Sequence, residues 1–274
     1  MKMSAVCFVT HYVDKYVERQ IQRLYDELGD REDLKLFIMY NLNDEHTNDY
    51  DFTKWSDKIE AWKFDEAKLD ELRLPYKEGF DNRDRWQNPE MPMLGFWKEH
   101  QGEFWRFWFI EYDVWFNGDW NVFFDRYKPL NCKTDLLASH VRKTEDSWYW
   151  KGKYNDPDGE ITDDMVWNSF NPILGVTDRL ISYLYSCYEK GMTGYFEAMF
   201  AICVNHFNKY AKGERERAMK MENLDFVFEQ GAGEVSISSV RYTPPVYSYE
   251  LVQENVLYHP LKSNTIDDKI VKTE

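Results

Sequence analysis

Cysteine and long apolar runs are both scarce in this sequence of 274 residues. The four cysteines, Cys7, Cys132, Cys187 and Cys203, lie far apart and form no C-x-x-C pair. This spacing disfavours zinc sites and redox motifs and favours reduced, buried thiols. No apolar run has the length of a membrane span, and the N-terminal apolar stretch is too short for a signal peptide. We therefore expect a cytoplasmic protein without an integral membrane segment.

Positive charge is also in deficit, with 34 Lys and Arg against 49 Asp and Glu, which gives a net charge of −15. Such a chain repels nucleic-acid phosphates, so nucleic acid is an unfavoured partner. Aromatic residues are abundant at 18%, with 11 Trp and 19 Tyr. Trp and Tyr offer flat surfaces for sugar rings or planar ligands, and a packed aromatic core is the alternative.

The first 40 residues have the pattern of a β-α-β unit. Residues 5–10 (AVCFVT) are apolar and β-branched, and residues 34–40 (LKLFIMY) repeat that pattern before Asn41. Between them apolar residues recur at helical spacing, with Asp14 as the expected N-cap and Gly29 as the stop. We expect two parallel strands joined by a right-handed crossover helix.

The rest of the chain continues the alternation of strands and helices. Expected strands are 59–64, 104–110, 135–140, one near Phe226 and 235–240, and expected helices are 65–72, 93–100, 120–127, 178–190 and 195–210. We interpret 74–92 as a loop over the ligand face. The pattern predicts a single α/β domain over 1–262, a mostly parallel sheet flanked by helices, and a polar tail at 263–274.

The most apolar of these segments, 104–110 (FWRFWFI), is followed by Glu111 and Asp113. A strand that is apolar on both faces belongs in the middle of a sheet, and ligands of open α/β sheets bind where such strands end. On an extended backbone the two carboxylates share one face, where they could hold a divalent cation or a sugar hydroxyl. Ion pairs with Arg or Lys are the alternative.

Three further groups of residues are candidates for chemistry. Glu197 stands at the start of a predicted helix, which stabilises its carboxylate as a proton acceptor, and a first-turn Glu that only complements the helix dipole is the alternative. Arg179 could contact phosphate, and an ion pair with Asp178 or a solvated position is the alternative. The candidates for stacking on an acceptor are Trp115, Trp148 and Trp150.

Five motifs together resemble a family of predicted glycosyltransferases that is distantly similar to the core-2/I-branching N-acetylglucosaminyltransferases. They are the opening β-α-β unit with its polar exit at Thr10–His11, the central FIEYDVWFNGDWNVFF, then DLLASH, NPILGVTDRLI and the late YHPLK. The resemblance extends from about Ala5 to Lys262. It implies the GT-A-like fold of nucleotide-diphospho-sugar transferases.

The resemblance also implies roles for individual residues. Glu111 and Asp113 stand where GT-A enzymes carry a D-x-D element, with Glu in place of the first Asp. They would hold Mn²⁺ or Mg²⁺, but the branching relatives work without a metal, so metal dependence stays open. His259 and Lys262 match a late H-P-x-K element and would offset the charge of the leaving diphosphate; a turn at His259–Pro260 before a disordered tail is the alternative.

The remaining roles complete the hypothesis of an inverting glycosyltransferase. Thr10, His11 and Asn41 would line the nucleotide pocket, Arg179 would contact the donor, and Glu197 would deprotonate the acceptor. These roles imply the transfer of a hexosyl or N-acetylhexosaminyl group from a nucleotide-diphosphate sugar to a carbohydrate hydroxyl. The alternatives are an inactive nucleotide-sugar-binding protein and a carbohydrate-binding module. The oligomeric state stays open.

Overall fold

The fold is an α/β arrangement around a mostly parallel sheet of seven strands, in the order β10-β6-β8-β4-β1-β2-β3. The computed structural model describes residues 3–43, 46–74, 88–130, 133–213, 216–230, 237–247 and 250–262. The expected α/β class is confirmed, and the strand predicted to be central, β4, has three strands on either side. The residues of the predicted loop from 75 to 87 and of the predicted tail lie outside the described residues, as does Cys132.

Two compact units divide the chain, and both are discontinuous in sequence. Unit 1 comprises Met1–Ala5, Phe64–Phe109 and Leu130–Asn223. Unit 2 comprises Val6–Lys63, Ile110–Pro129 and Leu224–Glu274. Strands β1 and β4 pass from one unit into the other, so the sheet itself is shared. The boundary of a single domain at residue 262 stays a prediction.

Unit 2 contains the β-α-β unit that the sequence predicts. Its first elements are β1 (Met3–Thr10), α1 (Lys15–Leu28), β2 (Leu34–Asn41), a 3₁₀ turn (Thr53–Trp55) and β3 (Ile59–Phe64). The Asp14 side chain accepts hydrogen bonds from the backbone N–H groups of Tyr16 and Val17, and Gly29 follows the last residue of α1. The predicted cap and stop are therefore both confirmed.

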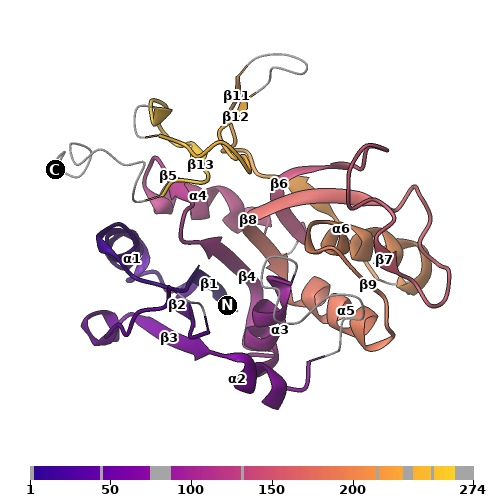
Figure 1. The fold of residues 1–274 in the computed structure, drawn as a ribbon, viewed down its shortest axis with the longest axis horizontal. Coiled ribbons are helices and arrows are strands. Elements are labelled where there is room, and N and C mark those ends of the chain that lie inside the picture. Colours follow the sequence, from indigo (N-terminus) through magenta and orange to yellow (C-terminus); the bar gives the residue numbers. More distant parts are fainter. Residues whose placement is uncertain are drawn as a thin grey trace. The chain divides into compact units, whose positions relative to one another are not determined.

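The later elements of unit 2 come from the middle and from the C-terminal part of the chain. They are β5 (Trp115–Phe116), α4 (Trp120–Tyr127), a 3₁₀ turn (Lys128–Leu130), β11 (Glu229–Gln230), β12 (Ile237–Ser238) and β13 (Leu257–Tyr258). β13 pairs antiparallel with β5, and the two strands run side by side in Figure 1. Phe226, where a strand was predicted, lies in a turn instead.

Unit 1 contains most of the remaining helices and strands. Its elements are α2 (Glu66–Glu71), α3 (Glu90–Glu99), β4 (Phe104–Glu111), β6 (Leu136–Lys143), β7 (Tyr154–Asn155), β8 (Trp167–Thr177), α5 (Asp178–Glu189), β9 (Thr193–Gly194), α6 (Phe196–His206), a π-helical turn (Phe207–Ala211) and β10 (Met221–Asn223). Helices α5 and α6 pack on each other and on β8. None of the helices in the described ranges has the length and apolar character that a membrane crossing requires.

The longest strand, β8, was not predicted, and it runs antiparallel to β6. Proline normally excludes a segment from the centre of a sheet because it donates no backbone hydrogen bond. Pro172 is tolerated because the register shifts around it: Gly175 pairs with Leu137, but Phe170 already pairs with Ser139. One residue of β6, Ala138, thus lies opposite four residues of β8, 171–174, and this bulged stretch contains the proline.

The edge strand β10 was also missed, because it lies at the end of a segment interpreted as a charged connection. Met221–Asn223 pairs parallel with Leu136–Ala138. Edge strands are commonly short and charged, which prevents pairing with other molecules. Composition alone therefore did not distinguish this strand from a loop.

Candidate functional site

The acidic pair lies in unit 2, at the end of β4. Glu111 is the last residue of the strand, and the chain then turns through Tyr112 and Asp113. The backbone N–H of Val114 donates to the Glu111 carbonyl at 3.0 Å, and that of Tyr112 donates to the Val9 carbonyl in β1 at 3.0 Å. The extended backbone assumed for this pair was therefore wrong. The two carboxylates come together through a turn instead of a shared strand face.

The pairing of β5 with β13 brings the C-terminal residues to this turn. Trp115 is opposite Tyr258 and Phe116 is opposite Leu257. Because the two strands are antiparallel, the residue after Tyr258 lies at the same end of the pair as the residue before Trp115. His259 is therefore close to Val114 and Asp113. The backbone N–H of Leu261 then donates to the Asp113 carbonyl at 2.8 Å.

Four charged side chains meet there, and we call Glu111, Asp113, His259 and Lys262 the charged cluster. His259 Nε2 lies 3.6 Å from Glu111 Oε2 and 3.4 Å from Asp113 Oδ1. Lys262 Nζ lies 3.9 Å from the second Asp113 oxygen. The side chains of Asp113 and His259 are 8% exposed, against 38% for Glu111 and 48% for Lys262. The cluster thus has a buried centre and a solvent-facing rim.

A backbone carbonyl fixes the orientation of the His259 ring. His259 Nδ1 lies 2.8 Å from the carbonyl oxygen of Arg241. Because a carbonyl only accepts, Nδ1 carries the proton and donates it. Nε2 therefore faces the two carboxylates either as a second N–H donor or as a free lone pair. The protonation state of this one atom decides whether the cluster contains two balanced pairs or a net negative charge.

The electrostatic surroundings favour the protonated ring. Burial lowers the pKa of His259, but the Asp113 and Glu111 carboxylates outweigh it and raise the pKa to about 10. Partial removal from water and the Asp113 charge raise the pKa of Glu111, against the opposing effect of His259. At neutral pH His259 and Lys262 are then cations beside two carboxylates.

The same atoms also fit a divalent cation. One ligand atom each from Glu111, Asp113 and His259 lies within 4.8 Å of the other two. The buried Asp113 Oδ1 makes no hydrogen bond, and its ion-pair partner, His259 Nε2, lies 3.4 Å away. Two carboxylates and one imidazole suit a transition metal such as Mn²⁺, provided that Nε2 loses its proton. A proton and a metal ion therefore compete for one position.

Three aromatic rings, His11, Tyr12 and Tyr112, contact one another at the end of β1, next to Thr10. The His11 ring stands edge-on to Tyr12, at 4.8 Å between centroids, and to Tyr112, at 5.1 Å. Thr10 is buried, and its hydroxyl donates to the Tyr12 carbonyl at 2.6 Å. Sequence reasoning missed Tyr12 and Tyr112, although both adjoin residues that it selected. Burial, followed by the charge of Asp14, raises the pKa of Tyr12 to about 12, so it stays neutral.

Asn41 and Trp115, also in unit 2, have structural partners. Asn41 ends β2, where its side-chain oxygen accepts from the backbone N–H of Asn43 at 3.0 Å. Trp115 is 8% exposed, with Tyr16 stacked near one ring face and the Arg23 guanidinium 4.6 Å from its centroid. These contacts are those of packed residues. The proposed roles in binding nucleotide and acceptor stay predictions.

The other predicted residues lie in unit 1. Arg179 pairs with the buried Asp135 at 2.9 Å, whereas Asp178 accepts from the indole N–H of Trp97 at 2.8 Å. An ion pair is thus present, but not with the neighbouring Asp178 that the sequence suggested. Arg217 is a second partner of Asp135 at 3.0 Å.

Glu197 occupies the first turn of α6, as predicted, and its side chain is half-buried. The residue before the helix, Tyr195, stacks on Trp150 at 4.1 Å with an angle of 5° between the rings, and Trp148 lies 6.0 Å from Tyr195. Both tryptophans are half-buried. Trp148, Trp150 and Tyr195 therefore form an aromatic patch that adjoins the N-terminus of the helix carrying Glu197.

Comparison with known proteins adds little to this picture. No protein-family model and no curated protein matches the chain. One similar solved structure is the 4-diphosphocytidyl-2C-methyl-D-erythritol synthase from Anaerococcus prevotii DSM 20548. It has 12% sequence identity and a TM-score of 0.41, over 82% of this chain and 88% of that chain.

Proposed function

We propose that this protein is a glycosyltransferase that moves a sugar from a nucleotide-diphosphate donor to a carbohydrate hydroxyl. The observation that carries the proposal is the charged cluster at the end of a central strand. Ligands of open α/β sheets bind at such strand ends. When the sugar is transferred, the nucleoside diphosphate leaves and gains negative charge. Cations held at a fixed position stabilise that charge.

His259 and Lys262 supply those cations in the proposal. His259 is held by the Arg241 carbonyl and charged by its two carboxylate neighbours, and Lys262 is 48% exposed at the rim. Glu111 and Asp113 orient both cations and accept hydrogen bonds from donor hydroxyls. In a metal-bound form, Glu111, Asp113 and His259 Nε2 would hold Mn²⁺, which supplies the positive charge for the diphosphate when bound.

Glu197 is the proposed general base, and the aromatic patch is the proposed acceptor platform. A first-turn carboxylate is stabilised as an anion by the helix dipole and accepts a proton from an acceptor hydroxyl. Trp150 and Tyr195 are parallel and stacked, and such rings pack against the apolar faces of sugars. One base without a separate nucleophile corresponds to direct displacement with inversion at the sugar carbon.

The test combines a donor panel with two pairs of variants. Purified protein is titrated calorimetrically with UDP-, GDP- and CMP-sugars, with Mn²⁺ and with EDTA, and donor hydrolysis and transfer are then assayed. We expect Asp113→Asn to weaken donor binding at least about tenfold, whereas the exposed control Asp30→Asn leaves it unchanged. We expect Glu197→Gln to keep donor binding and to lower turnover about 100-fold or more, with Glu189→Gln as the matched control on α5.

Each alternative has its own outcome in this experiment. Donor binding without hydrolysis or transfer, unaffected by Glu197→Gln, identifies an inactive nucleotide-sugar-binding protein. Glycan binding without any nucleotide affinity identifies a carbohydrate-binding module. Equal donor binding in Mn²⁺ and EDTA assigns the counter-charge to His259 and Lys262, whereas binding that needs Mn²⁺ assigns it to a metal.

A further inference from the structure

One face of α1 carries polar side chains that contact the backbone of a distant segment of unit 2. Gln20, Arg23 and Glu27 lie three and four positions apart on this helix, so they share one face. Gln20 is 2% exposed, and most of the other buried residues of α1 are apolar. A buried polar side chain needs hydrogen-bond partners, so the partners of Gln20 indicate what it does.

These side chains bind the segment that follows the turn containing Asp113. Gln20 Nε2 donates to the Val114 carbonyl at 2.6 Å. Arg23 donates to the carbonyls of Phe116 at 3.0 Å and Gly118 at 2.5 Å. Alternate residues of an extended segment present their backbone groups to opposite edges, and the other edge of this segment pairs with β13. The side chains of α1 therefore take the place of a neighbouring strand.

The contact with Gln20 lies one residue from the charged cluster. Val114 is buried and directly follows Asp113, and its backbone N–H donates to the Glu111 carbonyl at 3.0 Å. Both backbone groups of Val114 are therefore fixed, the N–H by the turn and the carbonyl by α1. The Asp113 carbonyl accepts from the backbone N–H of Leu261 at 2.8 Å. Asp113 is thus held on both sides.

The amide of Gln20 forms hydrogen bonds through its nitrogen alone. Nε2 donates its second hydrogen to the Tyr16 hydroxyl at 3.2 Å. Oε1 is buried, and no described residue donates a hydrogen bond to it. Because the Val114 carbonyl only accepts, the amide atom that faces it is the nitrogen. A buried oxygen without a partner costs free energy, and the contact with Val114 offsets that cost.

We propose that Gln20 is a positioning residue of the charged cluster. Its hydrogen bond fixes Val114 and thereby keeps the Asp113 carboxylate 3.4 Å from His259 Nε2. The attraction between charges falls with distance, so a displaced Asp113 interacts more weakly with the imidazole. This role concerns the cluster itself. Its consequence for the donor, weaker binding when Gln20 is replaced, rests on the proposed function.

Urea unfolding of the full chain at pH 6 in EDTA tests the positioning role without a donor. Gln20→Leu keeps a buried side chain of similar size and removes the N–H groups. If Gln20 positions Asp113, part of the stabilisation by His259 is already lost in Gln20→Leu. The factor by which His259→Gln raises the unfolding equilibrium constant should then be about fivefold smaller in Gln20→Leu than in the wild-type protein. Equal factors would overturn the inference, because a separate structural role makes the two effects independent.

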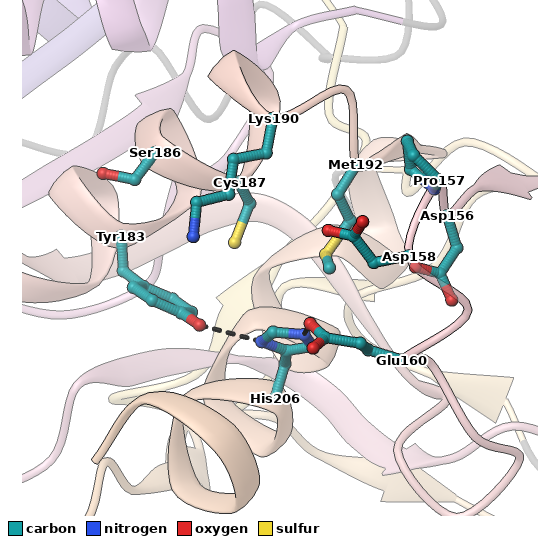
Figure 2. Close-up of a pocket in the computed structure, with 10 residues that line it drawn as sticks. All are labelled: Asp156, Pro157, Asp158, Glu160, Tyr183, Ser186, Cys187, Lys190, Met192 and His206. Atoms are coloured by element: carbon teal, nitrogen blue, oxygen red, sulfur yellow. Dashed lines mark hydrogen bonds and ion pairs between the residues drawn. The ribbon is translucent and has the colours of Figure 1, made fainter. Parts of the chain in front are cut away.

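A buried polar side chain of unit 1 provides the matched control. The His206 side chain is 7% exposed and lines a cavity of about 20 Å³ (Figure 2). Its Nδ1 lies 2.8 Å from the Tyr183 hydroxyl, and its Nε2 lies 2.9 Å from Glu160 Oε2. His206→Gln disturbs these contacts and leaves the charged cluster intact, so it should not alter the factor for His259→Gln. A reduction as large as in Gln20→Leu would assign the effect to lost stability in general.

A second variant separates the hydrogen bond from the packing of the side chain. Gln20→Glu keeps the shape of the side chain, and its protonated carboxyl donates to the Val114 carbonyl, whereas its carboxylate only accepts. Burial favours the protonated form at low pH. Relative to the wild-type protein at the same pH, the factor for His259→Gln should be unchanged at pH 5 and reduced at pH 8. The same reduction at both pH values would contradict a role for the hydrogen bond.

Donor titration measures the consequence for the proposed function. Gln20→Leu should weaken donor binding about fivefold or more, because a displaced carboxylate no longer orients its partners, and His206→Gln should leave it unchanged. Unchanged donor affinity in Gln20→Leu would refute this extension to the donor. If the wild-type protein binds no donor while Gln20 and His259 remain coupled in unfolding, the proposed function fails and the positioning role stands.

Discussion

Removing the imidazolium from the charged cluster should destabilise the protein in a pH-dependent way. The perturbation is His259→Gln, which keeps a polar side chain but leaves Glu111 and Asp113 without their shared cation. In the wild-type protein the pKa of His259 is about 10 when folded, against an ordinary 6.5. At about 1.36 kcal/mol per pKa unit, this difference corresponds to about 5 kcal/mol.

The sign of the pH dependence follows from the raised pKa. A histidine whose folded pKa lies above its unfolded value stabilises the protein fully below about pH 6.5, and that contribution is lost as the pH rises through about 10. The expected cost of His259→Gln is therefore up to about 5 kcal/mol at pH 6, about 3 kcal/mol at pH 8 and close to zero above pH 10. Proton uptake by Glu111 reduces the cost at pH 6, because its pKa is already raised.

Urea unfolding followed by tryptophan fluorescence measures this difference. Wild-type protein and His259→Gln are compared in EDTA at pH 6, 8 and 10.5, so that metal binding does not contribute and other titrations cancel. The double variant His259→Gln/Asp113→Asn is the control, and it should regain part of the loss by removing one unpaired carboxylate. An equal loss at pH 6 and pH 10.5 would refute the electrostatic argument and assign the cost to packing.

Three further predictions concern the framework and are measured by urea unfolding. Asp135→Asn should cost about 3 to 5 kcal/mol, because it leaves two arginines beside a buried site without their counter-charge; Asp178→Asn nearby should cost less. Gly175→Ala should cost about 1 to 3 kcal/mol, because the added methyl would lie 2.7 Å from the Trp108 ring; no change would show that β4 and β8 adjust freely. Asp14→Ala should cost about 1 kcal/mol through loss of the α1 cap, and Asp14→Asn should restore most of it.

The sequence was most informative where one local cause determines an element. The β-α-β opening has a capping aspartate, a regular apolar stripe and two apolar strands, and every one of these signals agrees with the fold. The position of β4 followed from its apolar character on both faces, since only a central strand is covered on both sides. Such elements need no information from distant parts of the chain.

The features that were missed depend on contacts between distant residues. β8 contains a proline, and only the bulge opposite β6 makes that residue acceptable in a sheet. The partners of Asp135 come from α5 and from the segment before β10, so sequence proximity suggested Asp178 instead.

The pairing of β5 with β13 joins two segments that are synthesised at different times. Glu111 and Asp113 leave the ribosome first, and His259 follows roughly 150 residues later, which at ordinary translation rates is on the order of 10 seconds. During that interval two neighbouring carboxylates have neither of the cations that later accompany them. The final segment completes the charge balance once it pairs with β5. A nascent chain that stops short of residue 259 would have the acidic turn but no means of neutralising it.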